Sequence, residues 1–184
     1  MRRLIERVWH QVAKIAARPA VADWLIARSQ RTPYFHLPGY MDRWWLFNAY
    51  PANRSLPDAE RGKAKTISWL PSVRIHHILR EDRAAHAHDH PWSARTIILR
   101  GDYTERRLVG RLVHGNGEVW QRIKRDPGDT ARLRFGEFHH IERVSEGGVW
   151  TLFFTWSYGG SWGFNVAGQK VPWRDYLKRY PEGG

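Results

Sequence analysis

The sequence RAAHAHDHPWSARTIILRG spans residues 83–101 and places three histidines at alternate positions ahead of an apolar run. The histidines are His86, His88 and His90, and Pro91 follows them directly. In an extended strand, residues two apart project from the same face. We therefore expect the three imidazoles to point into one small volume. The apolar run at 94–101 is rich in β-branched residues and ends at a glycine, which favours a strand.

Several further runs of this kind follow in the chain. Short apolar segments that favour strands occur at residues 73–79, 94–101, 110–114, 118–123, 130–135 and 149–158. HGNGE at 114–118 and EGG at 146–148 are typical of hairpin turns. Many short strands separated by turns predict a sandwich or barrel, so the fold class is all-β.

The first third of the chain has a different pattern. Apolar residues recur at helical spacing over residues 4–30, and Pro19 is expected to break or restart the helix. Residues 32–57 carry four prolines around the aromatic segment MDRWWLFNAY, and we expect an irregular, partly buried arm there. A short helix is expected at 173–180. The predicted organisation is a helical and irregular arm at 1–66 that packs on a barrel domain at 67–184.

Composition limits the location and the chemistry. The chain has 184 residues, enough for one domain with its own core. It has no cysteine, so any metal must be held by His, Asp or Glu. No apolar run reaches the ~18 residues that a membrane span needs. The charged opening MRRLIERVWHQVAKIA lacks the apolar centre of a signal peptide, so we expect a cytoplasmic protein without membrane association.

The net charge of +12 raises the question of an anionic partner. The arginines are scattered along the chain rather than gathered in a basic tail. We therefore expect no specific binding of nucleic acid, and this remains the least favoured function.

A second histidine-bearing segment lies downstream, in PGDTARLRFGEFHHIERV at 127–144. Two histidines from one strand and one from a distant strand can meet across a small barrel. Three neutral imidazoles suit Fe, Zn, Ni, Cu or Co and leave coordination positions open, so we expect a divalent metal to be bound between these segments. His139 and His140 are neighbours and are expected to point to opposite faces. The alternative is that the histidines are polar surface residues.

These two segments resemble the two motifs of the cupin superfamily. The first is similar to the cupin pattern as His88-x-His90-x3-Ala94-x6-Gly101, and the second as Gly128-x5-Arg134-x-Gly136-x2-His139-x3-Arg143. The resemblance covers about residues 70–158 and implies a double-stranded β-helix, the jelly-roll barrel. HDHPW and the tail VPWRDYL further resemble a group of small bacterial and phage cupins.

The departures from the cupin pattern guide the functional expectation. Ala94 stands where the motif has a glutamate, so the resemblance implies a metal site with three ligands, His88, His90 and His139, and leaves His140 outside it. Such a site resembles those of dioxygenase-like cupins that hold ferrous iron. The resemblance thus favours Fe(II), with Zn, Ni or Mn as alternatives, and oxygenase-like chemistry on a small anionic substrate. The alternative is a non-catalytic cupin that binds a small molecule, with the histidines as cavity lining.

Other residues are candidates for supporting roles. Glu105 and Tyr103 are the candidate catalytic residues: Glu105 could replace the missing ligand or act as a base, although the alternative of a solvent-facing partner for Arg106 or Arg107 is favoured. Expected cavity residues are His86, Ala94, Thr96 and Ile98. One of His76 and His77 should face the barrel interior, and Asp89 should hold its turn. Arg134 and Arg143 are expected on the surface, Trp92 and Trp162 near the cavity mouth. The aromatic arm suggests a homodimer.

Overall fold

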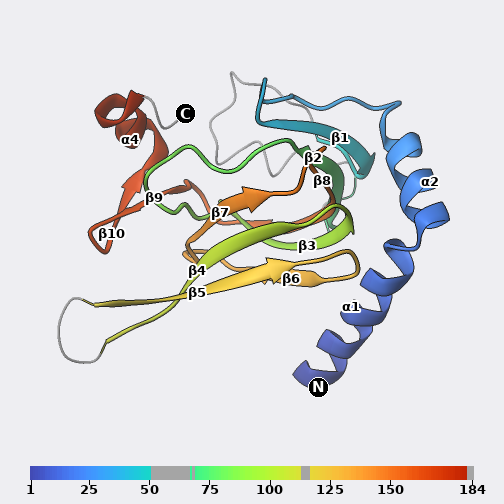
Figure 1. Cartoon of the computed structure of the whole chain (residues 1–184), viewed down its shortest axis with the longest axis horizontal. Coiled ribbons are helices and arrows are strands. Elements are labelled where there is room, and N and C mark those ends of the chain that lie inside the picture. The colour runs from blue at the N-terminus through green and yellow to red at the C-terminus, as the bar shows by residue number, and fades with distance from the viewer. Residues whose placement is uncertain (51–66, 68, 113–116, 182–184) are drawn as a thin grey trace.

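The computed structural model describes residues 1–50, 67, 69–112 and 117–181, and these form two facing antiparallel sheets with helices at one side and one end (Figure 1). The helices are α1 (Arg2–Ala16), α2 (Pro19–Ser29) and α4 (Trp173–Arg179). The strands are β1 (Met41–Phe47), β2 (Ser72–Ile78), β3 (Trp92–Arg100), β4 (Tyr103–Arg111), β5 (Glu118–Arg125), β6 (Thr130–Leu133), β7 (His139–Val144), β8 (Val149–Tyr158), β9 (Gly163–Val166) and β10 (Gln169–Pro172). The expected all-β fold class is confirmed.

The strands pair in two layers. One sheet has the order β1-β2-β8-β3-β6, and a smaller one has the order β5-β4-β7. His88 forms isolated bridges to both His139 of β7 and Phe164 of β9, so it connects the small sheet to the β9–β10 pair. The two layers face each other, as in the jelly-roll barrel that the cupin resemblance implies.

The two faces of the five-stranded sheet differ in chemistry. Its outer face is apolar, and Ile75, Ile97 and Leu152 pack there against Ala13 and Ala22 of the two N-terminal helices. Its inner face carries buried polar residues at the alternate positions, which include Arg74, His76, Thr96, Thr151 and Thr155. One hydrophobic cluster thus lies between the sheet and the N-terminal helices, and the barrel interior combines smaller apolar clusters with buried polar residues that are available for the site.

The N-terminal helices form as the apolar spacing predicts. Pro19 is the first residue of α2, where its missing N–H is tolerated, and α1 ends at Ala16. The expected helix at 173–180 is also present, as α4. No helix among the described residues is long and apolar enough to cross a membrane.

The expectation of an irregular arm at 32–57 is wrong for its centre. Residues 41–47 form β1, which pairs with β2 and becomes the edge of the five-stranded sheet. Trp45 is buried between the rings of Tyr34 and Tyr50. This burial stabilises the aromatic segment as an edge strand, a position in which flanking prolines are tolerated. Residues 51–57 lie outside the described part. The division at residue 66 remains a prediction, although the sheet itself extends across it.

Two expectations about the turns and strands need correction. EGG at 146–148 is a turn with positive φ at Gly147 and Gly148, but it leads from β7 in one sheet to β8 in the other, so it makes no hairpin. The strand expected at 110–114 begins at Tyr103, and its first half was missed because it carries three consecutive charged residues, Glu105 to Arg107, instead of an apolar run. β4 and β5 pair as the hairpin expected around HGNGE, of which residues 114–116 lie outside the described part.

Candidate metal centre

Three histidines from two segments meet inside the barrel. The ring nitrogens of His88, His90 and His139 all lie within 4.8 Å of one another. His139 begins β7, and His88 pairs with it through two reciprocal backbone hydrogen bonds of 2.9 Å. Because directly paired residues of an antiparallel ladder project to the same side, this bridge aims both imidazoles inward. The described residues thus contain the grouping that the motif spacing predicts.

The reason given for this grouping from the sequence was only partly right. Residues 83–90 form no strand apart from the single bridge at His88, so regular alternation does not aim the three histidines. His86 instead turns to the C-terminal helix, where its Nδ1 lies 3.0 Å from the hydroxyl of Tyr176. It is not in the three-histidine group, and its expected place in the cavity is not supported by the structure.

His90 and His139 face each other directly. Their Nε2 atoms lie 2.8 Å apart, so in the absence of an ion one of them must carry a proton and the other accept it. Two lone pairs directed at the same point are also what a shared metal ion requires.

Glu105 lies directly behind His139. Its Oε2 is 3.1 Å from His139 Nδ1, and its Oε1 is 2.8 Å from Nε of Arg125 and 2.9 Å from Nε of Arg107. Glu105 is fully buried, so the favoured expectation of a solvent-facing partner is wrong on exposure, although Arg107 is indeed its partner. Glu105 is also not among the grouped ligand atoms; it contacts a histidine instead.

The charge on Glu105 is stabilised by its neighbours. Burial alone would raise the pKa of Glu105, but the hydrogen bond with His139 and the charges of His139, Arg107 and Arg125 lower it to about 2. An ionised carboxylate can only accept, so Nδ1 of His139 must carry the proton. In the tautomer with the proton on Nδ1, Nε2 of His139 carries the lone pair, and Nε2 is the nitrogen that faces His90.

Asp82 plays the same part for His88. Its Oδ2 lies 3.6 Å from His88 Nδ1 and accepts the backbone N–H of Ile141 at 2.8 Å, while Oδ1 accepts the hydroxyl of Tyr40. Burial opposes the charge on Asp82, but His88 and these two hydrogen bonds hold its pKa below the usual value. A carboxylate therefore lies behind two of the three histidines.

Burial keeps the other two imidazoles neutral. It lowers the pKa of His88 to about 4 and that of His90 well below its usual value. Metal ligation requires the neutral imidazole, and ligating histidines commonly donate their other N–H to a carboxylate. The donor set and its supporting carboxylates thus fit a divalent metal ion.

The remaining cavity candidates line the inner face of the five-stranded sheet. Ala94 is buried beside Leu133 and Phe153, and Ile98 lies in a cluster with Tyr103. Thr96, between them on the same face, is buried as well. Tyr103 is a core residue, and burial and Glu105 raise the pKa of its hydroxyl, so it stays protonated.

The other expectations about single residues have separate outcomes. His76 is buried and stacks on Phe153, whereas His77 is half-buried on the other face of the strand, where it stacks on Trp150. Asp89 accepts a hydrogen bond from the backbone N–H of Gly163 and pairs with Lys170, and these contacts hold its turn.

Arg134 and Arg143 are 44% and 62% exposed, which confirms their surface placement. His140 is outside the group, although its Nδ1 lies 4.0 Å from Asp82. Trp162 lies 6.0 Å from the ring of His88.

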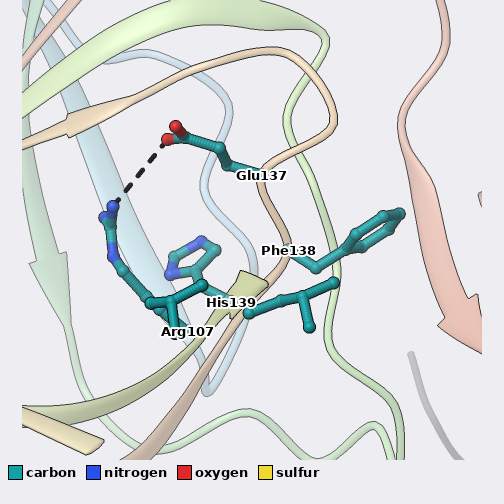
Figure 2. A pocket seen from close by; sticks show the side chains of 6 residues that line it. Arg107, Glu137, Phe138 and His139 are labelled. Carbon is teal, nitrogen blue, oxygen red and sulfur yellow. Dashed lines mark ion pairs between the residues drawn. The ribbon is translucent and has the colours of Figure 1, made fainter. Parts of the chain in front are cut away.

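A pocket of about 230 Å³ reaches the group at His139. Figure 2 shows His139 beside an ion pair of 4.0 Å between Arg107 and Glu137, with Phe138 on the other side. The residues that line it are Arg107, Leu108, Val109, Glu137, Phe138 and His139. One side of the histidine group is therefore accessible next to a guanidinium.

Sequence reasoning missed Asp82 and Tyr40, and it gave no role to Arg125. Asp82 precedes His88 by six residues in a segment without secondary structure, and Tyr40 is 42 residues before Asp82. No spacing rule connects them. The available signal was only that a carboxylate close in sequence to a ligating histidine is a candidate to orient it.

Comparison with known proteins gives a likeness of fold at low identity. No protein-family profile matches the chain, and no curated protein does. Oxalate decarboxylase from Bacillus subtilis is 13% identical with a TM-score of 0.48, over 81% of this chain and 32% of its own. An oxalate oxidase in complex with glycolate is 15% identical with a TM-score of 0.47, over 84% of this chain and 72% of its own. A vicilin from Solanum melongena is 14% identical with a TM-score of 0.47, over 79% and 35%. The chain spans about a third of the decarboxylase it matches.

Proposed function

We propose that this chain is a metal-dependent cupin that binds one divalent ion through His88, His90 and His139 and acts on a small anionic organic molecule. Fe(II) is the favoured ion, with Zn, Ni or Mn as alternatives, and the favoured chemistry is oxygenase-like. The observation that carries the proposal is the convergence of three imidazoles, one buried and two half-buried, of which two are backed by buried carboxylates.

The ligand charge supports an anionic substrate. Three neutral imidazoles leave the charge of a divalent ion uncompensated, and Ala94 provides no carboxylate in the fourth position. When bound, the ion would supply an open coordination position with Lewis-acid or redox character. The chain itself contributes orientation: Glu105 fixes the tautomer of His139, and Asp82 lies next to Nδ1 of His88.

Arg107 would act at the entrance to the site. Its side chain is 14% exposed, contacts Glu105 and Glu137, and lines the pocket that reaches His139. A guanidinium at this point attracts anions toward the group. We expect small molecules as partners; the homodimer and the cytoplasmic location remain proposals.

The second candidate is a non-catalytic cupin that binds a small molecule without a metal. The close approach of His90 Nε2 to His139 Nε2 favours it, because a hydrogen bond of 2.8 Å satisfies both rings without an ion. In that case the three histidines are a hydrogen-bonded part of the polar barrel interior.

Metal content distinguishes the two candidates. Protein purified without an affinity tag is analysed for metals, and the metal-free form is titrated with Fe(II) under anaerobic conditions. We expect one equivalent to bind to the wild type, and His88→Ala, His90→Ala and His139→Ala each to lose most of it, because two imidazoles hold a divalent ion much more weakly than three.

His140→Ala and His77→Ala are the matched controls, since both histidines lie outside the group. Both should bind the wild-type amount of metal. Equal loss in all five variants would indicate general destabilisation, and no uptake by the wild type would favour the metal-free binding protein.

A further inference from the structure

Arg74 is a fully buried arginine at the centre of the inner face of the barrel. It lies on β2 between Trp45 of β1 and Phe153 of β8, and it is 1% exposed. Among the described residues no carboxylate pairs with it, and its Nε and Nη2 atoms are buried without a hydrogen-bond partner. A buried charge is costly unless it is paired and hydrogen-bonded. Arg74 therefore needs a partner, and the described residues do not supply one.

Aromatic rings surround the guanidinium. Its Cζ lies 5.0 Å from the ring centre of Trp92, 5.4 Å from those of Trp45 and Phe153, and 5.6 Å from that of Tyr34. Cation–π contacts of this kind stabilise the cation but provide no acceptor for its N–H groups. The rings therefore hold Arg74 in place and leave its hydrogen-bonding edge free.

Within the described part of the chain, the positive charge at Arg74 has no counterion. Arg43 shares the ring of Tyr34 with Arg74, its Cζ being 4.8 Å from the ring centre. Burial and the neighbouring Arg74 lower the pKa of Arg43, against the opposing effect of Tyr34, to about 10. The buried carboxylates across the barrel already have partners, since Glu105 pairs with Arg107 and Arg125. Residues 1–50, 67, 69–112 and 117–181 thus provide no negative charge that pairs with Arg74.

The free edge of Arg74 matches one ligand chemistry. The Nε–H and one Nη2–H bond of a guanidinium are parallel, and such a pair fits the two oxygens of a carboxylate. A further unpartnered donor lies close by, because Nε1–H of Trp92 is buried without a partner; Nε2 of His76, two residues along β2, is also buried and unpartnered. A set of buried, unsatisfied donors around one cation is a site for an anion.

This region adjoins the three-histidine group through Phe153. The ring of Phe153 is 4.8 Å from that of His76 and 6.0 Å from that of His90, and it is also in contact range of Arg74. A small molecule that extends past Phe153 would reach both the guanidinium and the histidines.

We propose that Arg74 forms a carboxylate-binding subsite inside the barrel, with its Nε–Nη2 edge receiving the two oxygens of the substrate's carboxylate. The inference deepens the proposed function, on which it rests for the second, metal-bound end of the substrate. The site itself is built by Arg74 and its aromatic neighbours and does not require the metal.

Acetate is the probe, acetamide its neutral control, and the metal-free wild type the protein. At constant ionic strength, acetate should raise the midpoint of thermal unfolding, since a ligand that binds only the folded state stabilises it, and acetamide should not. Arg74→Met should weaken acetate binding at least tenfold in a calorimetric titration. Without acetate, Arg74→Met should be as stable as the wild type or more so, because a buried unpaired cation is replaced by an apolar chain.

Two further variants keep the test decisive. Arg143→Met removes an exposed arginine and should respond to acetate as the wild type does. Arg74→Lys retains a charge but loses the planar edge, so it should respond several-fold more weakly; it decides the case if Arg74→Met does not fold. Equal acetate affinity in the wild type and in the folded Arg74 variant, or no response of the wild type, overturns the proposal.

Metal binding separates this proposal from the proposed function. His88→Ala should lose the metal and keep its response to acetate, whereas Arg74→Met should keep the metal. An acetate response that depends on Arg74 without any metal uptake supports the subsite and contradicts the metal-dependent function. Metal uptake without an acetate response does the reverse.

Discussion

The charge and protonation of single residues inside the barrel are determined by the side chains that contact them. Glu105 is an ionised carboxylate in a fully buried position, and it remains charged because Arg107, Arg125 and His139 surround it. Its own effect is on His139, whose tautomer it fixes. Glu105 does not itself ligate the ion, but by orienting His139 it can influence the affinity for the metal.

Replacing Glu105 by Gln tests this role. The amide retains the size of the side chain but no longer fixes the proton on His139 Nδ1, so we expect metal affinity to fall by about 10–100-fold. The free energy of unfolding should also fall by about 3 kcal/mol, since two largely buried guanidinium groups lose their counterion. Competition with a chelator measures the first effect and urea denaturation the second.

Glu137→Gln is the control for this prediction. Glu137 also contacts Arg107, but it is 37% exposed and touches no histidine of the group. It should change metal affinity less than twofold. Similar losses in both variants would mean that the charge near Arg107, and not the bond to His139, is responsible.

His76 gives a prediction about pH. Burial and the positive charges of Arg74 and Arg43 lower its pKa, and His90 lies close to it. Below a pH of about 6.5, His76 is protonated in the unfolded chain but stays neutral in the folded chain. The free energy of unfolding therefore decreases as the pH falls from 7. His76→Phe, which retains the stacking on Phe153, should lose less stability between pH 7 and pH 5 than the wild type.

The comparison must be made between variants because His88 and His90 contribute in the same direction. His77→Phe on the other face of the same strand is the control and should follow the wild-type pH profile. Parallel profiles for the wild type and His76→Phe would show that the folded chain accommodates a charged His76.

Elements with a uniform environment could be predicted from the sequence. β8 is found at its expected bounds and β3 begins two residues early, since both are buried apolar runs. β4 and β7 were missed in whole or in part because they face the site and carry its charged residues. The local signal fails where function places polar groups inside.

The candidate site was predictable to the same extent. Motif spacing indicated His88, His90 and His139, although the strand assumed for His86 to His90 does not exist. Asp82 and Arg74 were not found, since their roles depend on which side chains face them across the barrel. Pairing between distant strands is not encoded in local periodicity.

The packing of α1 on the barrel allows a test at the level of one helix. Trp9 packs on the outer face of the sheet with its ring 5.1 Å from that of Phe154, and Arg95 lies 5.0 Å above it. Glu6, one turn earlier, accepts two hydrogen bonds from Arg95. The helix is therefore joined to β3 and β8 by a small set of side chains.

Trp9→Ala should lower the free energy of unfolding by about 2–3 kcal/mol, somewhat below the value for a fully buried tryptophan. Trp24→Ala on α2 removes the same side chain from a position that is 63% exposed, and its effect should stay within about 0.5 kcal/mol. Denaturant unfolding of the two variants beside the wild type measures the difference. Equal effects would mean that α1 contributes little to the stability of the barrel.

For the molecule as a whole, the net charge of +12 is distributed rather than concentrated. Many of the described arginines are paired with carboxylates on separate elements: Arg95 with Glu6, Arg100 with Asp23, Arg122 with Glu142, and Arg143 with Asp102. Others lie inside the barrel, as Arg74 does. Such pairing reduces the field that a long polyanion would meet.

We therefore expect nucleic acid to bind only weakly and without sequence preference, with a dissociation constant of about 10⁻⁴ to 10⁻⁶ M at physiological salt. Affinity should fall steeply as salt rises, because counterion release provides the whole driving force. Fluorescence anisotropy with duplex and single-stranded oligonucleotides of several sequences, at two or more salt concentrations, measures both quantities. Nanomolar and sequence-selective binding at physiological salt would contradict a function centred on the barrel interior. Such binding requires base-specific contacts, which paired and scattered surface arginines are not expected to make.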